Sequence, residues 1–433
     1  MDYVILGAGP AGVTAAETIR QHDGKGRITM IGGEPEPAYS RMAIPYLIHG
    51  KIAEQGTYLR QKADHFTSLG IEHQWGRATG VDAAAREISF ESGVKRNFDK
   101  LLIATGASPI VLPIPGASLP GVHNCWTLSD AREIMKLADN GAPVVLVGAG
   151  FIGCIVLEAL HLRGCKLTVV EIAPRMVARM MDETAGGMLT RWCREHGVDV
   201  HTGTAVQGIE KAASGPHPLS VKLSNGSSVP AKLVVLAAGV RSNTGFLAGT
   251  GIATKTGILV DQHLQTAVPG IYAAGDCCEG VDLSTGKPDM LAIQPVAVEH
   301  GRIAALNMAG VPTAHRGSLN MNVLDTMGLI SSSFGMWQGA PGGATAKITD
   351  EGKFQYLKLE FSDDRMVGAQ CVGMTDHVGM LRGLIQTGLR LGSWKDKLME
   401  APERVREAYI SVAQGAPQYG PTGPHVNVPR APQ

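Results

Sequence analysis

Two glycine-rich segments of this chain have the residue types and the spacing that can hold a phosphate group. One reads GAGPAG from Gly7 to Gly12, and the other reads GAGFIG from Gly148 to Gly153. In this pattern the first glycine permits a tight turn, the second leaves room for a pyrophosphate, and the third lets a helix pack closely on a strand. The amides at the start of that helix donate to the phosphate oxygens. We therefore predict two dinucleotide sites, formed by Gly7, Gly9, Pro10, Ala11 and Gly12 and by Gly148, Gly150, Phe151, Ile152 and Gly153.

An acidic residue ends the second expected strand of each unit. Glu34 follows the first glycine-rich segment and Glu171 follows the second. A carboxylate at that position binds the hydroxyl groups of a ribose. Glu171 would repel a 2'-phosphate, so the second site is expected to bind NADH rather than NADPH. Arg175, the next arginine along the chain, leaves that choice open.

The elements that must position these residues occur in the order of a parallel sheet. An apolar strand, a glycine turn, a helix and a second apolar strand are expected at residues 3–34 and again at 143–171. Further apolar strands end in small-residue turns at 101–109, 233–243 and 270–280. The last of these lies beyond the second unit, which implies that one domain is inserted in the other.

The predicted fold class is α/β, with two Rossmann-like dinucleotide-binding domains, the second inserted in the first, and a C-terminal α+β interface domain. Alternating segments such as FQYLKLEF and MVGAQCVG predict antiparallel strands in this last domain, followed by a helix over residues 378–391. The expected boundaries are 1–115 with 245–315 for the FAD-binding domain, 116–244 for the NAD(H)-binding domain, 316–416 for the interface domain and 417–433 for an extended tail.

Composition excludes several other classes of protein. The 433 residues include 39 basic and 39 acidic side chains, so no net charge attracts nucleic acid or an anionic membrane. The 55 glycines follow no G-X-Y period, and 44% of the residues are hydrophobic, which excludes collagen and disorder. The seven cysteines form no CxxC pair and the 14 histidines form no HxxxH or HExxH pair, so we expect no metal site.

Two further segments bear on location. The chain starts with Met1-Asp2-Tyr3 and has no basic region before its first apolar run, which is unlike a secretory signal and favours the cytoplasm. The apolar stretch 142–160 contains three glycines and Glu158. We therefore expect a buried strand, a turn and a helix there, and no membrane span.

The segment TAVPGIYAAGDCCEG at 266–280 resembles the FAD-binding strand of the FAD- and NAD(P)H-dependent pyridine nucleotide oxidoreductases. The motifs ATG at 104–106, AAGVRSN at 237–243 and QPVAVEHGRIAALNMAG at 294–310 extend this resemblance over roughly the first 310 residues. The nearest subgroup contains ferredoxin and rubredoxin reductases and the flavin module of nitrite reductases. The resemblance implies that further FAD contacts come from Ala78, Ala104, Thr105, Gly106, Gly275, Asp276, Val296 and Ala297, and that Gly239 contacts NAD.

The loop AYSRMAIPYLIHGKI from Ala38 departs from the subgroups that it resembles. Met42 stands where disulfide- and peroxide-reducing members have a redox cysteine, and methionine forms no thiolate. Tyr46 and Ile155 stand where ferredoxin reductases have a lysine and often a glutamate near the flavin and the nicotinamide. Tyr46 is therefore our candidate catalytic residue, with packing in the core as the alternative.

Other residues near these motifs have two interpretations each. Arg41 pairs with an FAD phosphate or caps its loop. Trp126 touches the flavin or fills a domain seam, and we favour the seam. Glu158 lies one helical turn after Ile155 and is interpreted as an acid on the helix face rather than as a substitute for the missing glutamate. Adjacent cysteines bond to each other only with strain, so Cys277 and Cys278 are interpreted as structural.

The resemblance implies an FAD-dependent NADH oxidoreductase that passes electrons from NADH through FAD to a small iron–sulfur carrier, a ferredoxin or rubredoxin, or to a partner metalloenzyme. In such proteins the cofactors carry the chemistry and the chain supplies orientation. The lack of a redox cysteine in the loop favours this kind of acceptor. The alternatives are an NADH oxidase that uses oxygen or a quinone, and a flavoprotein binding or assembly subunit with slow NADH turnover. The same resemblance implies a homodimer.

Overall fold

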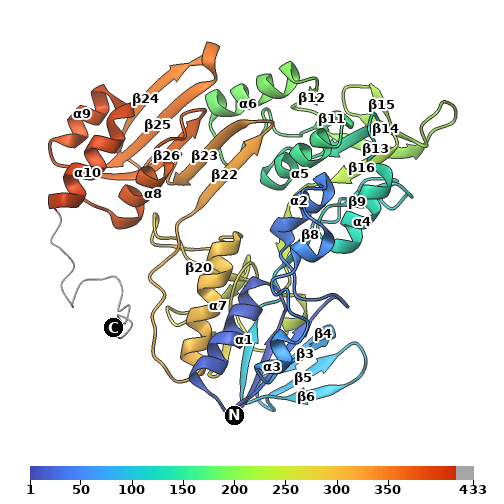
Figure 1. Cartoon of the computed structure of the whole chain (residues 1–433), viewed down its shortest axis with the longest axis vertical. Coiled ribbons are helices and arrows are strands. Elements are labelled where there is room, and N and C mark those ends of the chain that lie inside the picture. The colour runs from blue at the N-terminus through green and yellow to red at the C-terminus, as the bar shows by residue number, and fades with distance from the viewer. Residues whose placement is uncertain (416–433) are drawn as a thin grey trace. The chain divides into compact units, whose positions relative to one another are not determined.

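The computed structural model describes residues 1–415 and divides the chain into two compact units (Figure 1). Unit 1 comprises Met1–Asn320 together with Leu324–Leu329. Unit 2 comprises Met321–Val323 and the chain from Ile330 onward. The expected tail at 417–433 lies outside the described residues. The other expected domain boundaries remain predictions.

Unit 1 contains a five-stranded parallel sheet with strand order β19-β7-β1-β2-β3. Its central strands are apolar and buried on both faces, as parallel strands covered by helices require. Helices α1 (Pro10–His22) and α7 (Gln294–Met308) pack against each other beside it. The strands are β1 (Asp2–Leu6), β2 (Arg27–Gly32), β3 (Ile71–Trp75), β7 (Lys100–Ile103) and β19 (Ile271–Ala273).

A second five-stranded parallel sheet has the order β12-β11-β10-β16-β9. Its strands lie between β7 and β19 in sequence, so it is formed by an inserted segment, as the sequence predicts. The elements of this segment are β9 (Val122–Asn124), α4 (Leu128–Leu137), β10 (Pro143–Val147), α5 (Phe151–Leu162), β11 (Lys166–Val170), α6 (Glu183–Glu195), β12 (Asp199–His201) and β16 (Leu233–Leu236).

Short strands and helices complete unit 1. The two chain segments that connect the large sheets run antiparallel as β8 (Ala107–Pro109) and β17 (Val240–Ser242). Helix α2 (Ile44–His49) packs on both α4 and α5. The remaining elements are α3 (His65–Ser68), β4 (Ala78–Asp82), β5 (Glu87–Phe90), β6 (Lys95–Asn97), β13 (Val206–Lys211), β14 (Leu219–Leu223), β15 (Ser228–Ala231), β18 (Ile258–Leu259), β20 (Cys278–Val281) and β21 (Pro288–Asp289).

Unit 2 is built on a sheet with the order β22-β23-β26-β25-β24, whose last four strands pair antiparallel as the sequence predicts. The expected helix over 378–391 is shorter, because Gly388 adopts a left-handed conformation (φ 59°) and ends it. The elements are β22 (Met321–Thr326), β23 (Leu329–Gly335), β24 (Ala344–Asp350), β25 (Gln355–Ser362), β26 (Arg365–Val372), α8 (Val378–Thr387), α9 (Trp394–Glu400) and α10 (Val405–Gly415).

The apolar stretch at 142–160 forms β10, a turn and most of α5, as expected. Within residues 1–415, none of the helices combines the length and the apolar character that a membrane crossing needs.

Candidate functional site

The first glycine-rich turn connects β1 to α1 and leaves open space where a phosphate would lie. Gly7 has φ 120°, and a Cβ atom on it would lie 2.0 Å from the carbonyl oxygen of Ala104. A Cβ on Gly12 would lie 1.9 Å from the carbonyl oxygen of Gly7. A Cβ on Gly9 would meet nothing within 4 Å, although Gly9 caps the N-terminus of α1. The first and third glycines are therefore fixed by packing, whereas the second faces free space next to helix amides, which fits a bound pyrophosphate.

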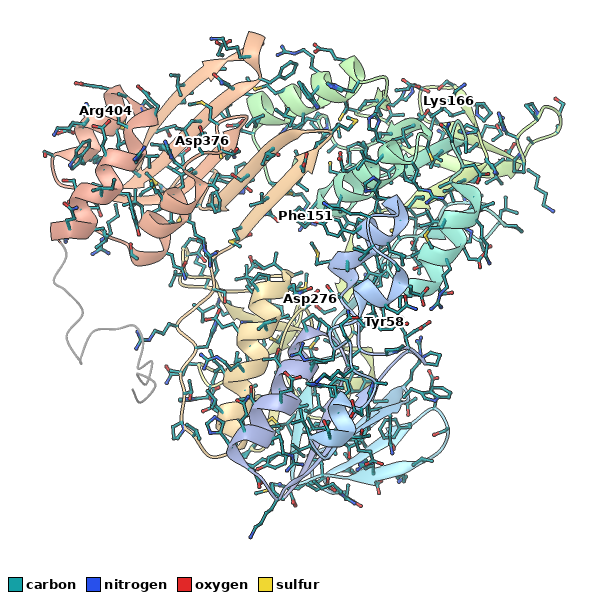
Figure 2. All side chains as sticks on the ribbon, viewed as in Figure 1. Tyr58, Phe151, Lys166, Asp276, Asp376 and Arg404 are labelled. Atoms are coloured by element: carbon teal, nitrogen blue, oxygen red, sulfur yellow. The ribbon has the colours of Figure 1, made fainter. Side chains whose placement is uncertain are left out.

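The second turn, between β10 and α5, repeats this geometry. A Cβ on Gly148 would lie 2.5 Å from the carbonyl oxygen of Ala237, and one on Gly153 would lie 2.1 Å from that of Gly148. Gly150 faces open space and caps α5, which begins at Phe151 (Figure 2). The turn is therefore equally suited to a second pyrophosphate.

The motifs at residues 104–106, 275–276 and 296–297 converge on the first turn. A Cβ on Gly275 would lie 3.3 Å from the Cβ of Ala297 and 3.4 Å from the Cβ of Ala11, so three segments meet at this point. The side chain of Asn243 donates to the carbonyl oxygen of Thr105 at 2.9 Å, and the Thr105 hydroxyl donates to the carbonyl oxygen of Asn243 at 2.9 Å. Segments distant in sequence thus meet beside the first turn.

The other predicted residues of the first site lie on several elements of unit 1. Pro10 starts α1, and Gly106 faces open space. Val296 is buried in the first turns of α7. Ala78 is half-buried at the start of β4.

Asp276 follows β19 and is labelled in Figure 2. Burial raises the pKa of its carboxyl group to about 6, and the positive charge of Arg41 opposes that shift. The carbonyl oxygen of Asp276 accepts a hydrogen bond from the Ser242 hydroxyl at 2.8 Å. Burial therefore makes this carboxyl group easier to protonate than that of an exposed aspartate.

Glu34, at the end of β2, is held by two neighbours. Its carboxylate accepts from the Tyr39 hydroxyl at 2.7 Å and from Nη2 of Arg41 at 2.5 Å. Nη1 of Arg41 donates to the Tyr39 hydroxyl and to the carbonyl oxygen of Trp126, both at 2.7 Å. Arg41 therefore holds its loop in place through these hydrogen bonds. Its pairing with an FAD phosphate remains a prediction.

Trp126 packs between segments that are distant in sequence. Its indole Nε1–H donates to the carbonyl oxygen of Ala107 at 3.0 Å, and its ring centroid lies 5.3 Å from Cζ of Arg41. Trp126 thus connects the start of α4 to β8 and to the loop after β2.

Glu171 is positioned at the second turn by backbone amides. Its carboxylate accepts from the amides of Ala149 at 2.6 Å and Ala173 at 2.8 Å. Arg175 is turned into its own loop, where it donates to the carbonyl oxygens of Met181 and Ala178. A 2'-substituent of a ribose bound at this turn would therefore face the negative charge of Glu171. That charge favours a hydroxyl group over a phosphate.

The remaining predicted residues of the second site lie on both sides of that turn. Phe151 and Ile152 form the start of α5 and are half-buried. Gly239 lies beside Ile110, whose Cδ1 would be 3.5 Å from a Cβ at that position.

Tyr46 lies on α2 and is 52% exposed, so the alternative of core packing is wrong. Met42, one turn earlier in the chain, is 44% exposed. Nζ of Lys51 lies 5.6 Å from the Tyr46 ring centroid. Met42 and Tyr46 are therefore both accessible. They are the two positions in this loop at which the resemblance implies other residues.

Glu158 lies on α5 and is half-buried. Its carboxylate accepts a hydrogen bond from the amide of Met327. Burial raises the pKa of this carboxyl group. It therefore fixes the turn between β22 and β23 and offers no free carboxylate in place of the glutamate missing at Ile155.

All seven cysteines are free and buried. Burial raises the pKa of Cys277 and of Cys278, the two cysteines that directly follow Gly275 and Asp276. The Cys277 thiol lies 3.3 Å from the carbonyl oxygen of Ile103. A buried thiol with a raised pKa is a poor nucleophile, which agrees with a structural interpretation.

Sequence reasoning missed the residues that join α4 and α5 to the loop after β2. Arg132 on α4 pairs with Glu36 and Glu54, and Arg163 after α5 donates to the carbonyl oxygen of Ile48 at 2.7 Å. The hydroxyl of Ser40 donates to Gln294, the first residue of α7, at 2.5 Å. No motif or periodicity signals these contacts, because each joins residues far apart in the chain.

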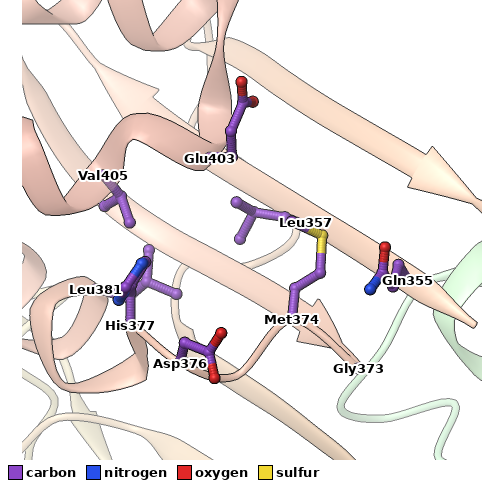
Figure 3. A pocket seen from close by; sticks show the side chains of 9 residues that line it. All are labelled: Gln355, Leu357, Gly373, Met374, Asp376, His377, Leu381, Glu403 and Val405. Atoms are coloured by element: carbon purple, nitrogen blue, oxygen red, sulfur yellow. The ribbon is translucent and has the colours of Figure 1, made fainter.

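Unit 2 contains a separate shallow pocket near the start of α8 (Figure 3). Leu357, Leu381 and Val405 form its apolar part, and Asp376 and His377 contribute polar groups. None of the predicted site residues lines it. Among residues 1–415 there is no group of three or more histidine, cysteine, aspartate or glutamate side chains placed to hold a metal ion.

Comparison with known proteins identifies the family of the chain. The family described as pyridine nucleotide-disulphide oxidoreductase matches residues 1–301. The chain belongs to this family. Members bind FAD and NAD(P)H, and this chain is accordingly an NAD(P)H-dependent flavin oxidoreductase that uses both cofactors. The two glycine-rich turns, each with open space at its second glycine, fit that pair of cofactors. The turn at Gly275 and Asp276, which meets the first of them, fits as well.

Individual members of the family show where this chain lies within it. The epsilon subunit of NADH-dependent phenylglyoxylate dehydrogenase from Aromatoleum evansii is 32% identical over 84% of this chain and 86% of that protein. An NADH oxidase from Methanocaldococcus jannaschii is 30% identical over 86% of this chain and 88% of that protein. A ferredoxin reductase from Rhodopseudomonas palustris has a similar structure, with a TM-score of 0.82 and 26% identity over 94% of this chain and 99% of that one.

Proposed function

We propose that this chain passes electrons from NADH through FAD to an iron–sulfur protein, either a small carrier such as a ferredoxin or rubredoxin or a subunit of a larger metalloenzyme. FAD held at the first glycine-rich turn would supply the chemistry, which is acceptance of a hydride from NADH and release of electrons one at a time. The residues of the chain bind the two nucleotides, orient them and exclude water.

The observation that carries this proposal is the lack of an accessible thiol. A member that reduces disulfides or peroxides needs a reactive cysteine near the flavin. By resemblance Met42 stands at the corresponding position, and all seven cysteines are buried. Electrons must then leave the flavin without a thiol intermediate, which an iron–sulfur partner permits.

NADH is the proposed donor because of the charge at the second turn. Glu171 is fixed there by two amides, and Arg175 is engaged within its own loop. Catalysis by Tyr46 stays a proposal, supported by its exposed position on α2 beside Lys51.

A second candidate is oxidation of NADH by oxygen, which the similarity to the archaeal NADH oxidase favours. The similarity to a subunit of an NADH-dependent dehydrogenase favours the larger partner over a small carrier. We further propose, by resemblance to the ferredoxin reductases, that the protein is a cytoplasmic homodimer.

Steady-state oxidation of NADH by the FAD-loaded protein tests the proposal. An added [2Fe–2S] ferredoxin or rubredoxin under anaerobic conditions should accelerate NADH oxidation at least about tenfold. Oxidation that is equally fast in air without a carrier would instead identify an oxidase. Sizing of the purified protein by light scattering tests the dimer.

A further inference from the structure

One guanidinium group joins helix α4 to two distant points of the loop that follows β2. Nη1 and Nη2 of Arg132 donate to the two carboxylate oxygens of Glu36 at 2.7 and 3.1 Å. Nη2 and Nε of the same residue donate to the two carboxylate oxygens of Glu54 at 2.7 and 2.9 Å. Both contacts are bidentate, the geometry in which an arginine–carboxylate pair is strongest and most directional.

One guanidinium makes four hydrogen bonds here, which distinguishes the group from a single-contact surface ion pair. The side chains of Arg132, Glu36 and Glu54 are 36%, 17% and 28% exposed, so all three are partly exposed. The guanidinium lowers the pKa of Glu54, the direction expected when a carboxylate gains an opposite charge. Without Arg132, two partly buried carboxylates would face each other unpaired, which disfavours the present position of the loop.

A second arginine holds the same loop between the Glu36 and Glu54 contacts. Arg163, at the C-terminus of α5, donates to the carbonyl oxygens of Ala138 at 2.8 Å and Met135 at 3.1 Å, near the end of α4. Its Nη1 also donates to the carbonyl oxygen of Ile48 in α2. Helix α2, which carries Tyr46, is therefore tied to both α4 and α5.

This arrangement bears on cofactor geometry because α5 starts at the second glycine-rich turn. The loop from 34 to 54 begins at Glu34, beside the first turn, and ends at the Arg132 contact. Helix α2, within this loop, packs on α5, so the loop joins the strand beside the first turn to the helix that starts at the second. Hydride transfer needs its reacting atoms about 3.5 Å apart, and a misplacement of about 1 Å can cost a factor of about 100 in rate.

We propose that Arg132 is a positioning residue for hydride transfer. Through Glu36 and Glu54 it fixes the loop that carries Tyr46 relative to the NAD-binding segment. The proposal rests on the use of NADH as donor and does not depend on the electron acceptor. Arg132 touches neither nucleotide in this account and acts through the two carboxylates.

Stopped-flow reduction of the FAD-loaded protein by NADH, without any acceptor, tests this role. Arg132→Gln should lower the limiting rate of flavin reduction by about tenfold to 100-fold and change the apparent Kd for NADH by less than about threefold. Arg132→Lys keeps the positive charge and loses the bidentate geometry of the guanidinium, so it should recover part of the rate of flavin reduction. Lys136→Gln is the matched control, because Lys136 pairs with Glu133 along the same helix and should leave the rate unchanged.

A second readout does not use the flavin reaction. Amide hydrogen exchange in α2 should become faster in Arg132→Gln than in the parent protein, with and without FAD, and should not change in Lys136→Gln. Glu36→Gln and Glu54→Gln should each show part of both effects.

Two results would overturn the inference. One is an Arg132→Gln protein that keeps its FAD and is reduced at the parent rate. The other is a lowered rate that comes with loss of FAD and is not partly restored in Arg132→Lys, which would indicate a general fault in folding. Failure of the parent protein to be reduced by NADH would instead contradict the proposed donor, so the two proposals fail separately.

Discussion

Replacing His300 with asparagine should make the folded protein less sensitive to acid. His300 lies on α7 and is 1% exposed, with Nδ1 placed 3.5 Å from the Cys278 thiol. Its ring packs edge-on against His315 at a centroid distance of 4.6 Å. His315 in turn lies 3.0 Å from the Ser318 hydroxyl and 4.0 Å from the carboxylate of Glu299. No described group offers His300 a negative charge at hydrogen-bond distance, so its protonation is unfavourable.

Burial, reinforced by the neighbouring His315, lowers the pKa of His300 to about 3. In the unfolded chain its pKa is about 6.5, so the unfolded state binds more protons between these two values and stability falls as the pH falls below about 6.5. At about pH 5 the lost stability is RT ln(1 + 10^1.5), which is about 2 kcal/mol relative to about pH 7.5. Burial also lowers the pKa of His315, which adds to the same trend.

Urea unfolding at about pH 7.5 and about pH 5, with FAD at a fixed saturating concentration, measures this loss. His300→Asn should lose about 2 kcal/mol less between the two pH values than the parent protein, whatever its stability at neutral pH. His22→Asn is the control, because His22 is exposed at the end of α1 and should leave the pH dependence unchanged. An equal loss in His300→Asn and the parent would refute the reasoning.

Three further predictions concern the cofactor sites. Glu171→Gln removes the fixed charge at the second turn and should raise kcat/KM for NADPH relative to NADH by about tenfold; an unchanged ratio would contradict its role in selectivity. Gly153→Val places a side chain about 2.1 Å from the Gly148 carbonyl oxygen. It should weaken NADH binding at least about tenfold while the absorbance of bound FAD is kept. Loss of FAD instead would show that the two sites do not act separately. Changing both Cys277 and Cys278 to serine should leave the rate of flavin reduction within about threefold, and iodoacetamide should not inhibit the parent; a loss above about tenfold would implicate a thiol.

Much of the fold follows from short stretches of sequence. The glycines at 7, 12, 148 and 153 are each required by a backbone atom within 2.5 Å of a would-be Cβ, so the turns that they form are specified locally. The strands flanking them are apolar on both faces, which identifies buried parallel strands. The late apolar strand at 271–273 pairs with β7, and this pairing accounts for the predicted insertion.

The contacts around the site could not be predicted in the same way. Arg132 lies 96 residues from Glu36 and 78 from Glu54, and an ion pair between distant loops leaves no periodic trace in sequence. The exposure of Tyr46 depends on how α2 packs on α4 and α5. Burial of Glu158 likewise depends on the turn at Met327, which is more than 160 residues away.

Reoxidation of the flavin is the most direct test of the proposed electron path. The FAD-loaded protein is first reduced anaerobically with one equivalent of NADH and then mixed either with an oxidised [2Fe–2S] ferredoxin or with air-saturated buffer. Transfer to an iron–sulfur protein predicts that the ferredoxin reoxidises the flavin at least about tenfold faster than oxygen does, with matching loss of the ferredoxin's visible absorbance. Rapid reoxidation by air with no reduction of the ferredoxin or of a rubredoxin would contradict it.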